Sequence, residues 1–308
     1  MKILIELPTW LGDTVMSTPA IENLVNFFDD SQITLVGSFV AIEILKYHPK
    51  IVKTYVLDKK FSNFYKTAKS FGEFDAFFSF RTSLRSKFMK FFISSKNKYQ
   101  FNKYKYIKNH QVEKYNNFIN DSLGINSIPG NLKLYIEKNN KKRKNKLLGI
   151  NPGSTYGSSK RWYPKEFASV AEKLSSQYDI IIFGGHDEKE IAKDIEKHLI
   201  KKGVDNFKNL ATKMTVQELL SQIATLDLFI TGDSGPMHIA AAFQVPTVSI
   251  FGPTKDIETS QWMNKKSGIV KKDLDCQPCM KRVCPLKHHN CMKLIKSTDV
   301  LEKLKVLN

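Results

Sequence analysis

A loop of small residues between an apolar strand and a helix is the most specific candidate binding site in this sequence. Its sequence is TGDSGPMHIAAA, from Thr231 to Ala242. The backbone N–H groups of Ser234 and Gly235 fall at the start of the helix, where unpaired donors and the helix dipole favour an anion. Pro236 suits the first helical turn, because its missing N–H costs nothing there. The loop therefore predicts an anion site.

A second candidate phosphate site follows an earlier apolar strand. Its sequence is NPGST, from Asn151 to Thr155, and Lys160 lies close behind. Hydroxyls and backbone N–H groups bind phosphate oxygens, and a lysine neutralises charge on a leaving group. The pattern suits a diphosphate, although its glycine spacing is neither that of a P-loop nor that of a dinucleotide fingerprint.

Acidic residues follow two other predicted strands. Asp13, in the sequence GDT, could act as a general base on an acceptor hydroxyl, or it could simply cap the helix that follows. Asp187 and Glu188 end the sequence FGGHDE. An acid there could accept hydrogen bonds from ribose or sugar hydroxyls. The alternative is a tight turn followed by acids that the helix dipole favours.

The four cysteines of the chain all lie between residues 276 and 291. They are Cys276, Cys279, Cys284 and Cys291. Such clustering in a cytosolic protein favours metal over disulfides, but the spacing differs from the paired C-x2-C pattern of common zinc sites. A structural zinc, reduced cysteines that pack a loop, and disulfides are three alternatives. We expect no catalytic metal, because the cluster falls outside the predicted cleft.

These candidate residues need a scaffold that brings the ends of several strands together. In the first half we predict strands over 2–7, 33–37, 52–57 and 76–80, and helices over 13–28 and 41–48. In the second half we predict strands over 147–151, 180–184, 228–232 and 247–251, and helices over 164–178, 188–201, 216–224 and 235–243. Alternating strands and helices predict parallel sheets covered on both faces.

A polar run separates the two halves. Its sequence is KNNKKRKNK, from Lys138 to Lys146, and such a shift in composition is typical of a linker. We expect two Rossmann-like α/β domains, residues 1–143 and 144–308, with ligands bound beyond the carboxyl ends of the strands. A terminal helix is expected from Ser297, and packing against the first domain is one alternative for it.

The composition is that of a globular protein. The 308 residues are 42% hydrophobic and 25% charged. No apolar run is long enough for a signal peptide or a membrane span, so we expect a cytoplasmic protein. Lysine and arginine number 48 against 30 acids, a net charge of +18 that attracts nucleic acid, anionic lipid or phosphorylated substrates. A lysine-rich genome is the simpler explanation of that charge.

A basic and aromatic segment lies within the first half. It has no acidic residue from Thr82 to His110. It is either an ordinary amphipathic surface or a contact for an anionic acceptor or for lipid headgroups. The candidates for acceptor contact are Gly12, Arg81, Arg85 and Lys87.

Five blocks of this sequence resemble the ADP-heptose:lipopolysaccharide heptosyltransferase family, which is glycosyltransferase family 9, and most closely its heptosyltransferase II branch. They are LPTWLGDTVMSTPAIENL, NPGSTYGSSKRWYPKEF, FGGHDE, TGDSGPMHIAAAFQVPTVSIFGPT and CQPCMKRVCPLKHHNCM. The resemblance implies an α/β GT-B fold, with two Rossmann-like domains facing across a cleft. It also implies an inverting transfer of L-glycero-D-manno-heptose from ADP-heptose onto the first heptose of the lipopolysaccharide inner core.

The resemblance implies roles for particular residues as well. Asp13 would be the catalytic base in an acceptor-binding first domain, and Lys160 would stabilise the leaving diphosphate. The donor-binding positions in the second domain would be Ser154, Thr155, Asp187 or Glu188, Asp233, Ser234, Gly235 and His238. The family needs no cofactor and no tightly bound metal. Its acceptor is anchored in lipid, so we expect transient contact with the inner face of the inner membrane, and no nucleic-acid partner.

Three other functions remain as alternatives. A heptosyltransferase I would act on Kdo-lipid A, and a nucleotide-sugar 2-epimerase of the same fold would isomerise its donor with no acceptor present. A basic nucleic-acid-binding protein would explain the net charge. It would leave Asp13 and the helix at Gly235 unexplained, and the sequence has no known nucleic-acid module.

Overall fold

The computed structural model describes residues 1–57, 68–107, 109–137 and 144–307. The chain divides into two units, Met1–Glu137 and Lys138–Asn308. The boundary predicted from the sequence, at residue 143, belongs to a stretch that lies outside the described residues. Within the part of the chain that is described, no helix is long and apolar enough to cross a membrane.

The first unit contains a parallel sheet with the strand order β3-β2-β1-β4-β5. Its strands are β1 (Lys2–Glu6), β2 (Gln32–Gly37), β3 (Ile51–Val56), β4 (Glu73–Ser79) and β5 (Ser94–Gln100). Strands β1 and β2 bury every residue except the first, as expected for parallel strands that are covered on both faces. The edge strand β5 is polar and was not predicted.

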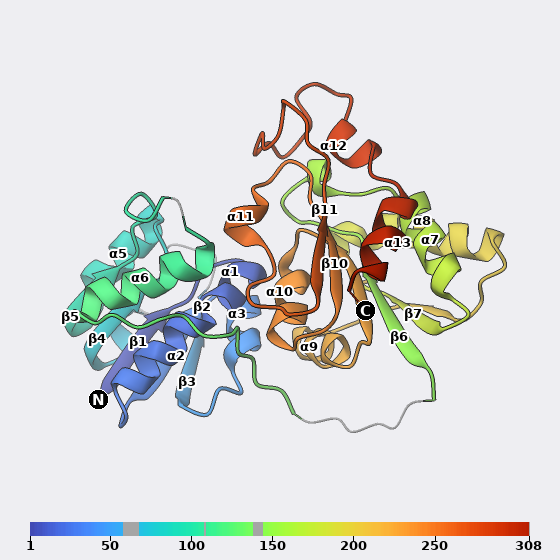
Figure 1. Cartoon of the computed structure of the whole chain (residues 1–308). Helices are drawn as coiled ribbons and strands as arrows, with labels where there is room; N and C mark the ends of the chain where they lie inside the picture. The colour runs from blue at the N-terminus through green and yellow to red at the C-terminus, as the bar shows by residue number, and fades with distance from the viewer. Residues whose placement is uncertain (58–67, 108, 138–143, 308) are drawn as a thin grey trace. The chain divides into compact units, whose positions relative to one another are not determined.

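Helices flank this sheet, as Figure 1 shows in blue to green. They are α1 (Leu11–Met16), α2 (Thr18–Phe27), α3 (Phe39–Leu45), α5 (Leu84–Phe92) and α6 (Gln111–Leu123). The single helix predicted over 13–28 is wrong, because the chain forms α1 and α2 with Ser17 between them. Pro19 lies in the first turn of α2 and has no N–H to continue the hydrogen bonding of α1, so the helix restarts there.

The second unit contains a parallel sheet with the strand order β11-β10-β9-β6-β7-β8. Its strands are β6 (Lys146–Asn151), β7 (Tyr178–Ile182), β8 (Phe207–Asn209), β9 (Leu228–Gly232), β10 (Thr247–Ile250) and β11 (Ser267–Val270). The short edge strands β8 and β11 were not predicted. The prediction of two α/β domains with parallel sheets is confirmed.

The second unit has seven α-helices among its described residues, and α7, α8, α12 and α13 pack on one apolar core with the strands. The helices are α7 (Pro164–Leu174), α8 (Lys189–Lys201), α9 (Val216–Ala224), α10 (Gly235–Ala242), α11 (Asp256–Thr259), α12 (Asn290–Lys293) and α13 (Ser297–Lys305), with short 3-10 turns η2 (Ser158–Lys160) and η3 (His186–Glu188). Helix α13 packs against α7 and β11 of its own unit. The fully buried Trp162 donates from its indole nitrogen to the Ile295 carbonyl at 3.0 Å, which ties the start of α7 to the C-terminal segment.

Each sheet has one point where the strand order reverses. In the first sheet it lies between β1 and β4, and in the second between β6 and β9. Loops that leave two such strands turn in opposite directions, and the crevice that this opens beyond the carboxyl ends is where α/β sheets bind ligands. The residues that follow β1, β4, β6 and β9 are therefore the ones to inspect in each unit.

Candidate active site

The carboxyl ends of β6 and β9 bring the two candidate phosphate loops together. Asn151 lies beside Thr231 in the strand register. The buried Asn151 amide donates to the Ser234 hydroxyl at 3.0 Å, and less closely to the Thr231 hydroxyl at 3.4 Å. This amide holds the start of α10 against the loop that begins at Pro152. The sequence placed Asn151 in the motif but did not identify it as a site residue.

Lys160 and Asp233 form a largely buried ion pair at this point. The Lys160 ammonium lies 2.6 Å from Oδ2 of Asp233, and the side chains are 11% and 6% exposed. The Thr254 hydroxyl donates to the same carboxylate oxygen at 2.6 Å. Lys160 also lies over the Tyr156 ring, 4.9 Å from its centroid. A lysine held by one carboxylate oxygen keeps further N–H donors for an anion.

Helix α10 begins at Gly235, directly after the ion pair. Ser234 is the N-cap residue, but its side chain makes no capping hydrogen bond. Pro236 lies in the first turn, as the sequence predicts, and His238 is buried on the same helix. Since the first N–H groups of a helix lack partners within it, the α10 terminus suits a phosphate beside Lys160.

The loop after β6 and the two acids after β7 have different environments. Ser154 is buried and its hydroxyl accepts from the Tyr156 N–H at 3.3 Å, whereas Thr155 is exposed. Glu188 is buried and accepts from the Gly185 N–H at 2.7 Å. Asp187 is exposed. Of the two acids that the sequence left as alternatives, only Asp187 presents its side chain to solvent, while Glu188 closes its own turn.

Glycine is required at one position of this loop. A Cβ added to Gly153 would lie 1.8 Å from Cγ of Glu188. Glu188 therefore packs directly against the backbone of the loop that carries Ser154. Gly153 therefore makes the contact with Glu188 possible, in addition to leaving room for a ligand.

The carboxyl ends of β1 and β4 form a second polar cluster, in the first unit. Glu6 is 1% exposed and accepts hydrogen bonds from the hydroxyls of Ser79, at 2.6 Å, and Ser86. The Arg81 guanidinium lies 3.5 Å from its other oxygen. Burial raises the pKa of Glu6, against the lowering effect of the two serines and Arg81. Glu6 thus brings a buried acid beside Arg81, a contact that the sequence did not suggest.

Asp13 lies in the first turn of α1, after the loop that follows β1. The N-cap residue is Trp10, so Asp13 is not the cap of this helix. The Tyr115 hydroxyl donates to Asp13 Oδ1 at 3.5 Å. Burial, and then the charge of Asp13, raise the pKa of Tyr115 well above its usual value, so this phenol stays a proton donor.

Aromatic packing connects Asp13 with the candidate acceptor residues. The Tyr115 ring packs edge-to-face on Phe80, with centroids 5.4 Å apart, and Phe80 precedes Arg81 in the chain. Gly12 and Asp13 thus lie at the same end of the first sheet as Arg81. Arg85 and Lys87 lie farther along the chain, on α5, where Lys87 is exposed.

The cysteine-bearing segment supports the loop that carries Lys160. The Ser159 N–H donates to the Arg282 carbonyl at 3.1 Å, its hydroxyl donates to the Lys281 carbonyl at 2.5 Å, and a ring nitrogen of His289 lies 2.9 Å from its carbonyl oxygen. Ser159 and Pro253, the neighbours in sequence of Lys160 and Thr254, line the same pocket as the four cysteines. The segment therefore contacts both loops that hold Asp233.

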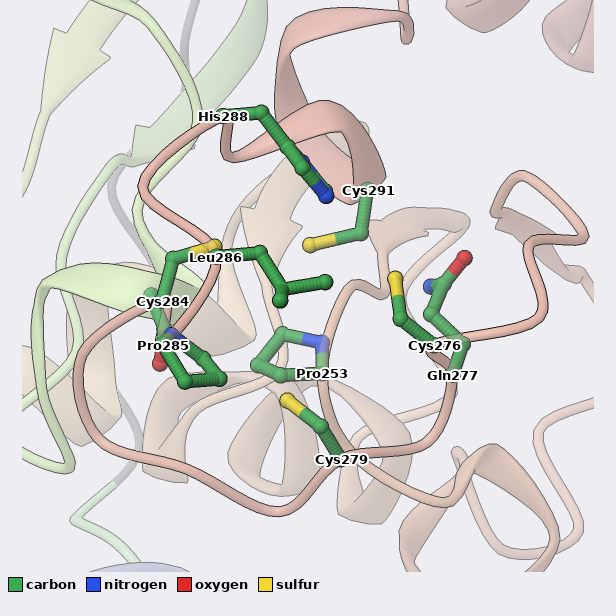
Figure 2. A pocket seen from close by; sticks show the side chains of 10 residues that line it. Pro253, Cys276, Gln277, Cys279, Cys284, Pro285, Leu286, His288 and Cys291 are labelled. Atoms are coloured by element: carbon green, nitrogen blue, oxygen red, sulfur yellow. The ribbon is translucent and has the colours of Figure 1, made fainter.

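All four thiols are free and surround this one pocket (Figure 2). Cys291 is buried, and burial followed by the charges of the other three cysteines raises its pKa to about 11. Among the described residues, no group of three or more His, Cys, Asp or Glu side chains is arranged to hold a metal ion. Reduced cysteines that pack a loop and structural zinc both stay hypotheses.

Comparison with known proteins places this chain in a family. Residues 76–290 match the model of glycosyltransferase family 9 (heptosyltransferase). The chain is 44% identical, over its full length and 98% of the relative, to lipooligosaccharide heptosyltransferase 2 of Campylobacter jejuni subsp. jejuni serotype O:2. A shorter match, 27% identical over 52% of this chain and 46% of the relative, is to lipopolysaccharide heptosyltransferase 2 of Escherichia coli.

Solved structures support the fold independently. A family 9 glycosyltransferase from Veillonella parvula matches with a TM-score of 0.83 and 20% identity, covering 99% of this chain and 96% of that one. ADP-heptose lps heptosyltransferase II of E. coli matches with a TM-score of 0.81 and 20% identity, covering 100% and 98%. At this identity the matches concern the fold alone, and they confirm the predicted GT-B class. Because the family model covers more than half of the chain and a full-length relative is 44% identical, the chain belongs to glycosyltransferase family 9, the heptosyltransferases.

Proposed function

We propose that this enzyme transfers L-glycero-D-manno-heptose from ADP-heptose onto the first heptose of a lipopolysaccharide or lipooligosaccharide inner core. The observation that carries the proposal is the 44% identity to a lipooligosaccharide heptosyltransferase 2, which extends over the whole chain. The charged cluster of Lys160, Asp233 and the α10 terminus supports it, because these groups suit a diphosphate leaving group.

In the proposed reaction, Asp13 is the base. The acceptor hydroxyl oxygen attacks the anomeric carbon of the heptose and its proton passes to the Asp13 carboxylate. The bond from that carbon to the β-phosphate oxygen breaks on the opposite side, and its electron pair leaves with ADP. One displacement of this kind inverts the anomeric configuration. Tyr115, which donates to Asp13, would keep the carboxylate oriented toward the hydroxyl.

Lys160 has the complementary role at the leaving group. Its ammonium would neutralise charge that develops on the β-phosphate, where the α10 N–H groups and Ser154 also bind oxygens. Asp233 is an anion and cannot itself bind phosphate. We assign it to holding Lys160, with its free acceptor positions available to a heptose hydroxyl. Asp187, exposed after β7, is the better candidate for contact with the ribose.

We further propose that the first unit binds the acceptor and the second the nucleotide sugar. Arg81, Arg85 and Lys87 would contact the anionic groups of the inner core, and the buried Glu6 would fix the orientation of Arg81. The acceptor of such a reaction is anchored in lipid, so the enzyme would act in the cytoplasm at the inner face of the inner membrane. The proposal needs no metal or cofactor and no nucleic-acid partner.

The test is ADP release from ADP-heptose with three acceptors: none, a core ending in Kdo, and a core ending in Kdo-linked heptose. We expect release only with the last, and a loss of at least 100-fold in kcat for Asp13→Asn, with donor binding retained. Release with the Kdo-terminated core instead would show a heptosyltransferase I. Donor isomerisation without acceptor would show an epimerase. Inactivity with tight, steeply salt-dependent RNA binding would favour the nucleic-acid alternative.

A further inference from the structure

Helix α5 carries three large apolar side chains on its solvent side. Leu84, Phe88 and Phe91 are 75%, 52% and 77% exposed. Their spacing of four and then three residues places them on one face of the helix. The opposite face carries Ser86 and Met89, which are buried, and Met89 belongs to the core of the first unit. Ser86 and Met89 therefore hold α5 against the first unit, and Leu84, Phe88 and Phe91 form an apolar ridge on its solvent side.

The rest of the solvent side of α5 is cationic. Lys87 is exposed and Lys90 lies in the last turn of the helix. The Lys98 ammonium, from the adjoining strand β5, lies 3.4 Å from the Phe91 carbonyl oxygen. The sequence from Thr82 to His110 has no acid to neutralise these charges. Aromatic and aliphatic side chains flanked by lysines are the composition that binds the interface of an anionic bilayer.

The ridge begins at the candidate acceptor site. The Ser86 hydroxyl bonds Glu6 and lies 2.7 Å from the Ser79 hydroxyl, so the first turn of α5 is fixed to the carboxyl ends of β1 and β4. Arg81, the other partner of Glu6, lies three residues before the helix. From Leu84 to Phe91 the ridge extends about 10 Å along the helix axis. Figure 1 shows α5 beside β4 and β5 of the first sheet.

We propose that Leu84, Phe88 and Phe91 insert into the headgroup region of an anionic bilayer, with Lys90 and Lys98 on lipid phosphates. The inference rests on the proposed function, because this surface adjoins the site that we assign to a lipid-anchored acceptor. Its physical basis is independent of that function. An acidic protein could also meet a cationic apolar surface, and the experiment distinguishes the two.

The first measurement is cosedimentation of the full chain with vesicles free of lipopolysaccharide. We expect binding to vesicles of phosphatidylglycerol and phosphatidylethanolamine, and weak binding to phosphatidylcholine. The triple variant Leu84→Ser, Phe88→Ser, Phe91→Ser should reduce partitioning by about tenfold or more. The matched control is Ile200→Ser, Ile257→Ser, Val306→Ser, which changes three similarly exposed apolar residues of the second unit and should bind as wild type does.

A second measurement separates this proposal from the enzymatic one. The triple variant should keep wild-type kcat/KM with a delipidated acceptor but lose about tenfold with the same acceptor embedded in vesicles. In a Phe91→Trp variant, tryptophan fluorescence should shift to the blue and be quenched by brominated lipid, unlike that of Ile257→Trp. The proposal would be overturned if the triple variant bound vesicles as the wild type does, or if the wild type did not bind them. Either result would favour an acidic protein as the partner of this surface. Inactivity with every acceptor, but vesicle binding through α5, would refute only the proposed function.

Discussion

The pairing of Lys160 with Asp233 would allow a buried lysine to bind the proposed diphosphate. An ammonium with little access to water needs a counter-charge, and the carboxylate supplies it through one oxygen at 2.6 Å. Thr254 donates to that same oxygen and fixes the carboxylate in turn. The lysine is therefore oriented before a substrate binds, and orientation of this kind is a main source of catalytic electrostatics.

We expect Lys160→Gln to lower kcat by about 100-fold to 1000-fold, the usual effect of removing one preorganised donor at a developing anion. Glutamine keeps a donor near Asp233 but removes its counter-charge, so the melting temperature should also fall. Steady-state ADP release checks the first expectation and calorimetry the second. Lys197→Gln, at an exposed pair with Asp194, is the control and should keep wild-type rates. A kcat within threefold of wild type for Lys160→Gln would contradict the assigned role.

Residue types and spacing predicted this cluster only in part. Lys160, Asp233 and Ser234 were identified because they follow apolar strands, and strands β6 and β9 do lie side by side. The contacts of Glu6 and Tyr115 in the candidate site were missed. Glu6 was predicted only as part of a strand. Its partners Ser79 and Ser86 are more than seventy residues away in the chain. No local pattern marks contacts that only the tertiary fold creates.

At the scale of elements, central strands were predicted better than edge strands. β1, β6 and β9 are apolar over most of their length because both faces are covered, and that pattern is visible in sequence. β5 has the sequence SSKNKYQ and is only half-buried, so its composition resembles a loop. The break between α1 and α2 was missed because the apolar spacing continues across Pro19.

The segment that bears the cysteines contacts η2, which carries Lys160 of the candidate site. A Cβ added to Gly157 would lie 2.3 Å from the Arg282 carbonyl oxygen, so Gly157→Ala must displace the turn that carries Lys160. We expect at least a tenfold loss of kcat and a lower melting temperature. Gly130→Ala is the control, since nothing lies within 4 Å of the added methyl. Unchanged turnover in Gly157→Ala would show that the Lys160 turn tolerates movement relative to this segment.

Helix α2 is joined to the last part of the first unit through Glu22. Burial would raise the pKa of Glu22, but hydrogen bonds from His48 and Lys133 outweigh it and lower the pKa to about 2. Tyr135 also donates to this carboxylate, at 3.0 Å. Because the folded pKa is lower than the ordinary 4.5, the stabilisation is complete above pH 4.5 and is lost as the pH falls toward 2.

We therefore expect Glu22→Gln to lower the free energy of unfolding by about 2 kcal/mol near pH 6, after allowance for the exposure of Lys133. The difference from wild type should shrink as the pH falls below 4.5. Urea unfolding at a series of pH values measures it. Glu190→Gln, at the exposed Lys193 pair, should change stability by less than about 0.5 kcal/mol at every pH. A constant difference across the series would mean that the charge of Glu22 is not its source.

At the scale of the whole molecule, the net charge of +18 should act mainly on the acceptor. A lipid-anchored core in an anionic membrane is a polyanion, which a long-range field attracts, whereas the proposed donor site would act through short-range contacts to Lys160 and α10. We expect kcat/KM for a vesicle-embedded acceptor to fall by about tenfold between low and high salt. The value for the donor, at saturating acceptor, should fall by less than about threefold.

Two variants of equal net charge can locate the source of that attraction. Changing Lys87, Lys90, Lys98 and Lys103 of the first unit to glutamine removes four charges from +18 and leaves +14. Changing Lys189, Lys193, Lys197 and Lys201 of α8 does the same in the second unit. If the acceptor meets the α5 surface, the first set should reduce the salt dependence of acceptor kcat/KM much more than the second, because screening limits each charge to about 10 Å. Equal reductions would assign the attraction to the overall charge of the protein, in which case the lysines of the first unit have no special place in binding the acceptor.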